Sequence, residues 1–186
     1  MNETVAVLQE KLRDLETQIE REIEEHRDQF HYSVTQKRIE FEAAVQSRHR
    51  EMRISVFRFL RRSGVMRILA ALTIYVLAMP LIILDIGVTL FQFICFPIYG
   101  IKKVPREDFI VIDRHHLAYL NPIEKLNCAY CGYANGLLAY AREVAGRTEE
   151  RWCPIKHARR VQGLHRGYYD FADYGDAESY RPRDNV

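Results

Sequence analysis

Apolar residues recur every eleven positions along the first third of the chain, among many charged ones. Two rows follow this spacing, the second offset by four positions: Leu8, Ile19, Phe30, Phe41 and Met52, and Leu12, Ile23, Val34, Val45 and Val56. Residues 3 to 56 contain neither proline nor glycine. Eleven residues make three helical turns, so the repeat places an almost straight apolar seam along a helix. The pattern predicts one long helix that reaches roughly 80 Å at 1.5 Å per residue.

This seam is narrow and lies between charged flanks, which is typical of a coiled coil. The rest of the chain is too short to cover a helix of that length. We therefore expect residues 1 to 56 to form a stalk that associates in parallel with copies of the same chain. The alternative is a helix that packs along the body of its own protein.

The next pattern is an apolar run from Ile68 to Ile101, in which Asp85 is the one charged residue. A membrane-spanning helix needs about 20 residues, and two passes of about 16 fit a slightly thin bilayer. Pro80 and Gly87 lie near Asp85 in the middle of the run, and these residue types favour a turn. We therefore predict a helical hairpin in the membrane. A single kinked span and a monotopic wedge are the alternatives.

Basic residues flank the apolar run at both ends: Arg58, Arg61, Arg62 and Arg67 before it, and Lys102, Lys103 and Arg106 after it. Because positive residues mark the cytoplasmic side of a membrane segment, both termini are predicted to be cytoplasmic. Arginines also alternate with apolar residues between positions 52 and 67. That stretch is predicted to form an interfacial amphipathic helix, or simply the positive flank of the membrane segment.

Three cysteines and a histidine follow the run at spacings common in metal sites. Cys128 and Cys131 form a CxxC pair directly before a glycine, and Cys153 and His157 are four positions apart after a predicted helix over residues 135 to 150. A CxxCG turn lets two thiolates bind one ion, and residues four apart share a helix face. The set predicts a tetrahedral site for Zn²⁺, with iron less favoured because a rubredoxin-like site needs four thiolates. The alternatives are a redox-active CxxC pair and cysteines that pack in the core without binding a metal.

Residues 126 to 160 resemble the ligand layout of zinc-ribbon and treble-clef modules, in which a CxxCG turn is combined with cysteine and histidine at the start of a helix. The resemblance implies structural zinc without catalysis. Residues 113 to 160 are also similar to bacterial inner-membrane proteins, and this similarity implies a location but no activity.

Charge and motif content narrow the function further. The net charge is +2, from 27 basic and 25 acidic residues, so the chain lacks the basic excess that a nucleic-acid binder needs. The sequence contains no Gly-rich phosphate loop, nucleophile elbow or HExxH motif, and we predict no catalytic residue.

These patterns predict a mainly α protein with four parts. They are a coiled-coil stalk (1–56), an amphipathic segment with a membrane hairpin (57–104), a small helical metal module (105–166), and an acidic, tyrosine-rich tail that is flexible or docked (167–186). We expect a homo-oligomeric membrane scaffold with a structural zinc site on the cytoplasmic side. Its predicted partners are the lipid bilayer, its own copies and another membrane protein. The alternatives are a redox or metal-handling membrane enzyme subunit and an accessory subunit of a larger membrane complex.

Overall fold

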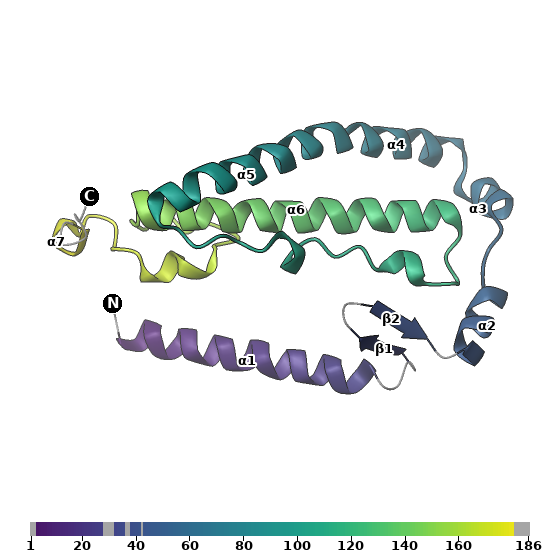
Figure 1. Ribbon diagram of the computed structural model, residues 1–186, viewed down its shortest axis with the longest axis horizontal. Helices are drawn as coiled ribbons and strands as arrows, with labels where there is room; N and C mark the ends of the chain where they lie inside the picture. Colours follow the sequence, from purple (N-terminus) through teal and green to yellow (C-terminus); the bar gives the residue numbers. More distant parts are fainter. Residues whose placement is uncertain (1–2, 28–31, 36–37, 42, 181–186) are drawn as a thin grey trace. The chain divides into compact units, whose positions relative to one another are not determined.

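The computed structural model describes residues 3–27, 32–35, 38–41 and 43–180. This part of the chain is mainly helical, as predicted (Figure 1). The contacts divide the chain into two units: Met1–Ile68 with Ile112–Ala129, and Leu69–Val111 with Tyr130–Val186. The second unit holds the candidate site.

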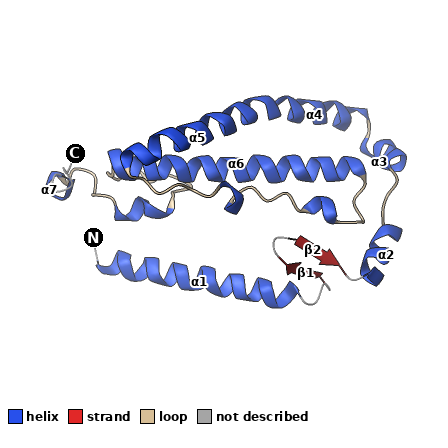
Figure 2. Cartoon of the chain, in the orientation of Figure 1, coloured by secondary structure: helices blue, strands red, loops and turns tan. Residues whose placement is uncertain are grey.

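The N-terminal region differs from the predicted continuous helix over residues 3 to 56. Three elements occupy its first part: α1 (Glu3–Arg27), β1 (Tyr32–Thr35) and β2 (Arg38–Phe41) (Figure 2). The strands pair antiparallel, with Tyr32 opposite Phe41 and Val34 opposite Ile39. Aromatic and β-branched residues alternate with polar ones here, and a period of two suits a strand, whereas these residue types lose side-chain freedom in a helix. The repeat member Phe30 lies outside the described residues.

Two short helices follow, α2 (Ala43–Glu51) and α3 (Val56–Ser63). Ser55 caps α3, because its Oγ accepts a hydrogen bond from the Arg58 N–H at 3.4 Å. Gly64 ends the helix with a φ of 73°, a conformation that favours glycine.

The apolar run forms α4 (Val65–Val76) and α5 (Ala78–Tyr99). Together they give one helical run, Ile68–Tyr99, that is long and apolar enough to cross a membrane, and an 18-residue stretch of it has a mean hydropathy of 2.3. The predicted hairpin is not formed, because α5 continues through Asp85 and Gly87. Pro80 is the third residue of α5, and the N–H groups of a first turn have no acceptor within their helix, so proline is tolerated there.

Helix α6 (Pro122–Trp152) is much longer than the predicted helix over residues 135 to 150. It starts at a capping box. Asn121 Oδ1 accepts hydrogen bonds from two N–H groups of the first turn, each at 3.0 Å, and Glu124 Oε2 accepts one from the Asn121 N–H at 2.9 Å. Proline at the first helical position also favours this start. The CxxC pair therefore lies inside a helix.

Helices α5 and α6 pack side by side and run in the same direction (Figure 1). The order of their contacts shows this, since Asp85 binds Tyr133 and Gln92 binds Tyr140 further along both helices. Their interface contains the buried apolar core of the unit, which consists of Phe96, Val104, Leu137, Tyr140 and Val144.

Residues 101–111 return along the two helices in the opposite direction. Val104 contacts Gln92, and Arg106, two residues later, contacts Asp85 nearer the start of α5. A short 3-10 helix, η2 (Arg106–Asp108), lies in this returning segment. Two others follow later in the chain: η3 (Arg114–His116) and η4 (Arg166–Asp170).

After α6 the chain continues to a short last helix, α7 (Ala177–Tyr180). Ile155 forms a parallel bridge with Ala172, and Tyr168 and Phe171 are buried. The first residues of the predicted tail are therefore docked, while residues 181–186 lie outside the described part.

Candidate functional site

The polar and apolar side chains of α5 are arranged in the reverse of the order typical of a soluble helix. Its buried and half-buried residues recur at intervals of three and four: Ala78, Leu81, Asp85, Val88, Gln92, Cys95 and Phe96. Its outer face exposes ten large hydrophobic side chains by 37% to 72%: Met79, Ile82, Ile83, Leu84, Ile86, Leu90, Phe91, Phe93, Ile94 and Ile98. The carboxylate and the amide thus face the protein while apolar groups face outward, as expected where the surroundings are apolar.

Asp85 is the centre of a cluster of hydrogen-bond donors. Arg106 binds it in a bidentate manner, with Nε 3.1 Å from Oδ1 and Nη2 2.6 Å from Oδ2. The Tyr133 hydroxyl donates to Oδ2 at 2.9 Å, and the Thr89 hydroxyl donates to Oδ1 at 3.4 Å. The Asp85 side chain is 14% exposed. Its charge is therefore compensated by a geometry that gives strong charge-assisted bonds.

The same contacts fix the protonation of the two main donors. The hydrogen bond to Asp85 raises the pKa of Arg106. Burial, and then the bond to Asp85, raise the pKa of Tyr133 above its ordinary value of 10.0. At neutral pH the guanidinium is charged and the phenol is neutral, so both groups donate protons to the carboxylate.

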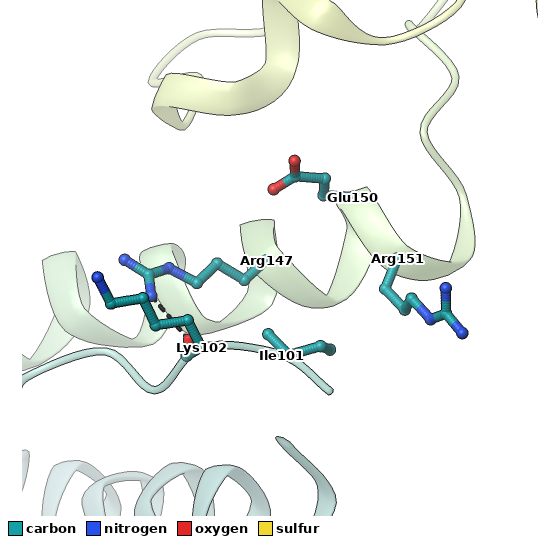
Figure 3. Close-up of a pocket in the computed structure, with 5 residues that line it drawn as sticks. All are labelled: Ile101, Lys102, Arg147, Glu150 and Arg151. Atoms are coloured by element: carbon teal, nitrogen blue, oxygen red, sulfur yellow. Dashed lines mark hydrogen bonds between the residues drawn. The ribbon is translucent and has the colours of Figure 1, made fainter. Parts of the chain in front are cut away.

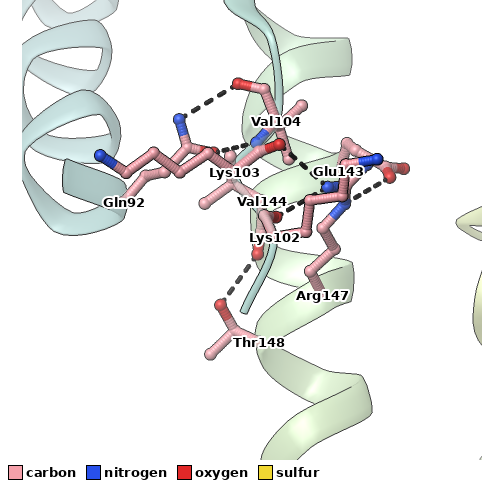
Figure 4. A network of polar contacts seen from close by, with 8 residues as sticks. All are labelled: Gln92, Lys102, Lys103, Val104, Glu143, Val144, Arg147 and Thr148. Atoms are coloured by element: carbon pink, nitrogen blue, oxygen red, sulfur yellow. Dashed lines mark hydrogen bonds and ion pairs between the residues drawn. The ribbon is translucent and has the colours of Figure 1, made fainter. Parts of the chain in front are cut away.

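Gln92 satisfies the backbone of the returning segment. Its Oε1 accepts a hydrogen bond from the Val104 N–H at 2.6 Å, and its Nε2 donates to the Val104 carbonyl at 3.2 Å (Figure 4). Its Nε2 also donates to the Tyr140 hydroxyl at 3.0 Å. The side-chain amide therefore acts as a neighbouring strand would. Val104 is buried in the core of the unit, and buried non-helical backbone requires such partners.

The Arg147 side chain provides hydrogen-bond partners for two further backbone carbonyl groups of the returning segment. Its Nη1 donates to the carbonyl oxygens of Lys102 and Lys103 at 2.7 Å and 3.2 Å, and its Nε pairs with Glu143 at 3.0 Å. One guanidinium thus holds the start of the returning segment against α6 (Figure 4).

Glycines in α6 let the returning segment approach closely. A Cβ at Gly132 would lie 3.1 Å from the Val111 carbonyl oxygen, and one at Gly136 would lie 2.9 Å from Ile110 Cα and clash with the Phe109 carbonyl. Small residues four apart often permit such contact in membrane proteins. The glycine after the CxxC pair therefore serves helix packing, where the sequence pattern indicated a metal-binding turn.

The structure does not bring the four predicted metal ligands together. Cys128 and Cys131 lie in α6, and Cys153 follows its end. The helix between Cys131 and Cys153 is roughly 30 Å long at 1.5 Å per residue, which exceeds the reach of one ion's coordination sphere. The His157 ring contacts the Tyr168 hydroxyl instead, with Nδ1 3.0 Å away. No group of three or more His, Cys, Asp or Glu among the described residues could hold a metal. The zinc prediction thus has no support from this geometry.

The sequence analysis predicted neither the partners of Asp85 nor the start of α6, although the sequence contains a feature that indicates each of them. An ionisable residue inside an apolar run needs a partner, and Arg106 is among the basic residues that follow. The sequence Asn121-Pro122-Ile123-Glu124 is a helix start with a capping-box spacing. The contact between Gln92 and Val104 has no local signal, because it joins an amide to the backbone.

A pocket of about 440 Å³ lies just beyond the end of α5. It is lined by Ile101, Lys102, Arg147, Glu150 and Arg151 (Figure 3). The site thus combines a compensated carboxylate within the apolar run and a mainly basic pocket at its end.

Comparisons of this chain with protein-family models, curated proteins and solved structures found no match.

Proposed function

We propose that this protein is a homo-oligomeric scaffold on a membrane surface, in which the outer face of α5 enters one leaflet. The segregation of side chains on α5 carries this proposal. Exposed large hydrophobic residues cover its outer face, and its carboxylate and amide point to the protein. A continuous apolar surface of this kind marks contact with a membrane or another apolar surface.

The position of charge along α5 favours a helix that lies in the plane of the membrane. Asp85 is near the middle of the run Ile68–Tyr99, and Arg106 binds it from η2, where Glu107 and Asp108 are also exposed. In a spanning orientation these charges would be at the centre of the bilayer, at a cost of several kcal/mol each. An in-plane helix buries its apolar face only about 5–10 Å deep, and η2 on its inner side then stays in water.

The basic flanks of the run agree with this orientation. Arg61 and Arg62 precede the run, and Lys102 and Lys103 follow it. An in-plane helix keeps both flanks on one side, where they meet anionic headgroups. Both termini are then on that side, as the charge pattern predicts.

Helix α1 supports the oligomeric part of the proposal. Its apolar stripe is exposed by 53% to 59% in this single chain, at Leu8, Leu12, Leu15, Ile19 and Ile23. The spacing of three and four residues suits a parallel coiled coil with a second copy. Two chains held on one membrane also meet at a raised effective concentration, which favours pairing of a helix only 25 residues long. The scaffold would thus hold copies side by side.

The outer face can be tested by substitution. We expect the variant Ile83→Asn with Ile94→Asn to bind liposomes at least about 30-fold more weakly, because about 1–2 kcal/mol of apolar transfer is lost at each site. The matched control carries Val111→Asn with Val161→Asn, which are also exposed hydrophobic positions. Chains synthesised with liposomes are separated by flotation. If the first variant floats as completely as the control, the proposed membrane face is wrong.

The stripe on α1 is tested by Leu15→Asp with Ile19→Asp. Because unpaired burial of charge is costly, this variant should be a monomer in detergent by light scattering. A control with Thr17→Asp and Arg21→Gln, both exposed positions, changes the net charge by the same amount away from the stripe and should keep its mass. Equal masses for the two variants would contradict assembly through α1.

A further inference from the structure

The pocket lies next to the end of α5, whose outer face is proposed to lie in the plane of the membrane. Ile101 and Lys102 follow Tyr99, the last residue of α5, by two and three positions. Three residues reach at most about 10 Å, and an in-plane helix lies at the boundary of the headgroups and the acyl chains along its whole length, so the pocket is within reach of the headgroups. Tyr99 also meets Trp152 edge to face, with ring centroids 5.0 Å apart. Tyrosine and tryptophan favour this interfacial zone.

The pocket carries an excess of positive charge. Its lining includes three cationic side chains and one carboxylate. The negative end of the α6 dipole favours Arg151, the basic residue in the last turn of that helix. It does not account for Lys102, which comes from the returning segment. Across the described residues, neither the Lys102 ammonium nor the Arg151 guanidinium has a hydrogen-bond or ion-pair partner.

The geometry of these cations suits a ligand that is both anionic and lipidic. Figure 3 shows the ends of Lys102 and Arg147 at one end of the pocket and Arg151 at the other, with Ile101 between them. Arg147 is held in place by Glu143 and by the Lys102 carbonyl, so part of the site is preorganised. Ile101 lines the same pocket and is half-buried against the core, so it offers an apolar contact beside the cations.

The neighbouring Lys103 also points to lipid. Its ammonium lies 4.5 Å from the centre of the Phe93 ring, and Phe93 is 67% exposed on the outer face of α5. A lysine stem along an apolar face, with its charge at the end of that face, is the snorkelling arrangement of membrane interfaces.

We infer that this pocket binds the phosphate-bearing headgroup of an anionic phospholipid. Lys102 and Arg151 supply the unpaired positive charge, Arg147 supplies a fixed guanidinium, and Ile101 contacts the start of the acyl chains. The inference rests on the proposed membrane-surface location.

Trp152 is the single tryptophan of the chain, and it follows Arg151 directly, so its fluorescence reports on lipid at the pocket. The full chain is reconstituted in vesicles of equal parts phosphatidylglycerol and phosphatidylcholine, with bromine on the acyl chains of one lipid or the other. We expect brominated phosphatidylglycerol to quench Trp152 more strongly than brominated phosphatidylcholine. Added inorganic phosphate should leave this preference unchanged.

The variant Lys102→Gln with Arg151→Gln should lose the preference, since each basic residue near the surface contributes about fivefold. The control Arg159→Gln with Arg160→Gln removes the same charge from exposed positions outside the pocket and should keep it. The ratio of the two quenching values is compared within each variant, so a changed tryptophan environment cancels.

Equal quenching by the two lipids in the parent, or a preference retained in the Lys102/Arg151 variant, would overturn the headgroup site and leave the membrane location intact. Loss of the preference on adding phosphate would assign the pocket to free anions and overturn the lipid assignment. Quenching by neither lipid would overturn the membrane location and the site with it.

Discussion

Replacing Arg106 with glutamine should destabilise the protein by about 2 kcal/mol, because Asp85 loses its bidentate partner. Hydrogen bonds to charged groups contribute about 1.5–3 kcal/mol each, and removing one partner exposes the other to its desolvation cost. The loss is below that of a fully buried pair, because Arg106 is 45% exposed and water replaces part of its effect. Tyr133 and Thr89 also continue to donate to Asp85.

For a chain of this length, 2 kcal/mol corresponds to a fall in Tm of roughly 4–8 °C. We expect this fall for Arg106→Gln in detergent micelles, measured by circular dichroism at the helical band. The matched control is Arg160→Gln, which removes an exposed arginine outside the cluster and should change Tm by less than about 2 °C. In the double variant Asp85→Asn with Arg106→Gln, neither charge is left unpaired. Its loss should be about 1 kcal/mol smaller than the sum of the two single losses.

Two results would refute this reasoning. Arg106→Gln could unfold at the same temperature as Arg160→Gln, which would mean that water compensates Asp85 fully. The single losses could also be additive, which would mean that Asp85 and Arg106 do not interact in solution.

Three further predictions address other parts of the second unit. Gly136→Ala should destabilise by about 1–3 kcal/mol because its Cβ meets the Phe109 carbonyl, whereas Gly87→Ala, with no neighbour within 4 Å, should stabilise by up to about 1 kcal/mol in unfolding measurements; equal signs would contradict the packing. Tyr133 has a raised pKa in the folded state, so its contribution is complete below about pH 10 and is lost as the pH rises through the folded pKa. The fall in Tm above that pH should be shallower in Tyr133→Phe, and identical slopes would exclude this contact. Cys131→Ser should change the unfolding free energy by less than about 0.5 kcal/mol, because the thiol is exposed; unfolding of the variant, with one zinc per chain in the parent by elemental analysis, would restore the predicted metal site.

The sequence was sufficient to predict a mainly helical chain with a long apolar run, because both depend on residue type and local period. The hairpin was predicted from Pro80, Asp85 and Gly87, three residues that favour turns. Pro80 falls in the first turn of α5, where it is tolerated, and Asp85 is held by Arg106. The first outcome depends on where α5 begins, and the second depends on a tertiary contact that the local pattern does not contain.

For the predicted metal site, too, the local sequence pattern was not sufficient to predict the structure around it. Cys128 and Cys131 with the following glycine have the spacing of a zinc turn, but the capping box at Asn121 starts a helix upstream that includes them. Gly132 then permits close packing on Val111, so the same glycine serves a different purpose. The predicted N-terminal helix was interrupted for a local reason, since the alternating residues from Tyr32 to Phe41 favour strands. The competing period of two was present in the sequence but was hidden by the eleven-residue repeat.

The sidedness of the two ends of the chain tests the in-plane orientation of α5 most directly. Glu20→Cys in α1 and Tyr174→Cys, which is 71% exposed, are made separately in a cysteine-free background and expressed in a bacterial host. A membrane-impermeant maleimide is then added to intact spheroplasts and to permeabilised ones. We predict that both positions are labelled only after permeabilisation, because an in-plane helix keeps both ends on the cytoplasmic side. Labelling of either position in intact spheroplasts would contradict the account, and labelling of one alone would show that α5 spans the membrane.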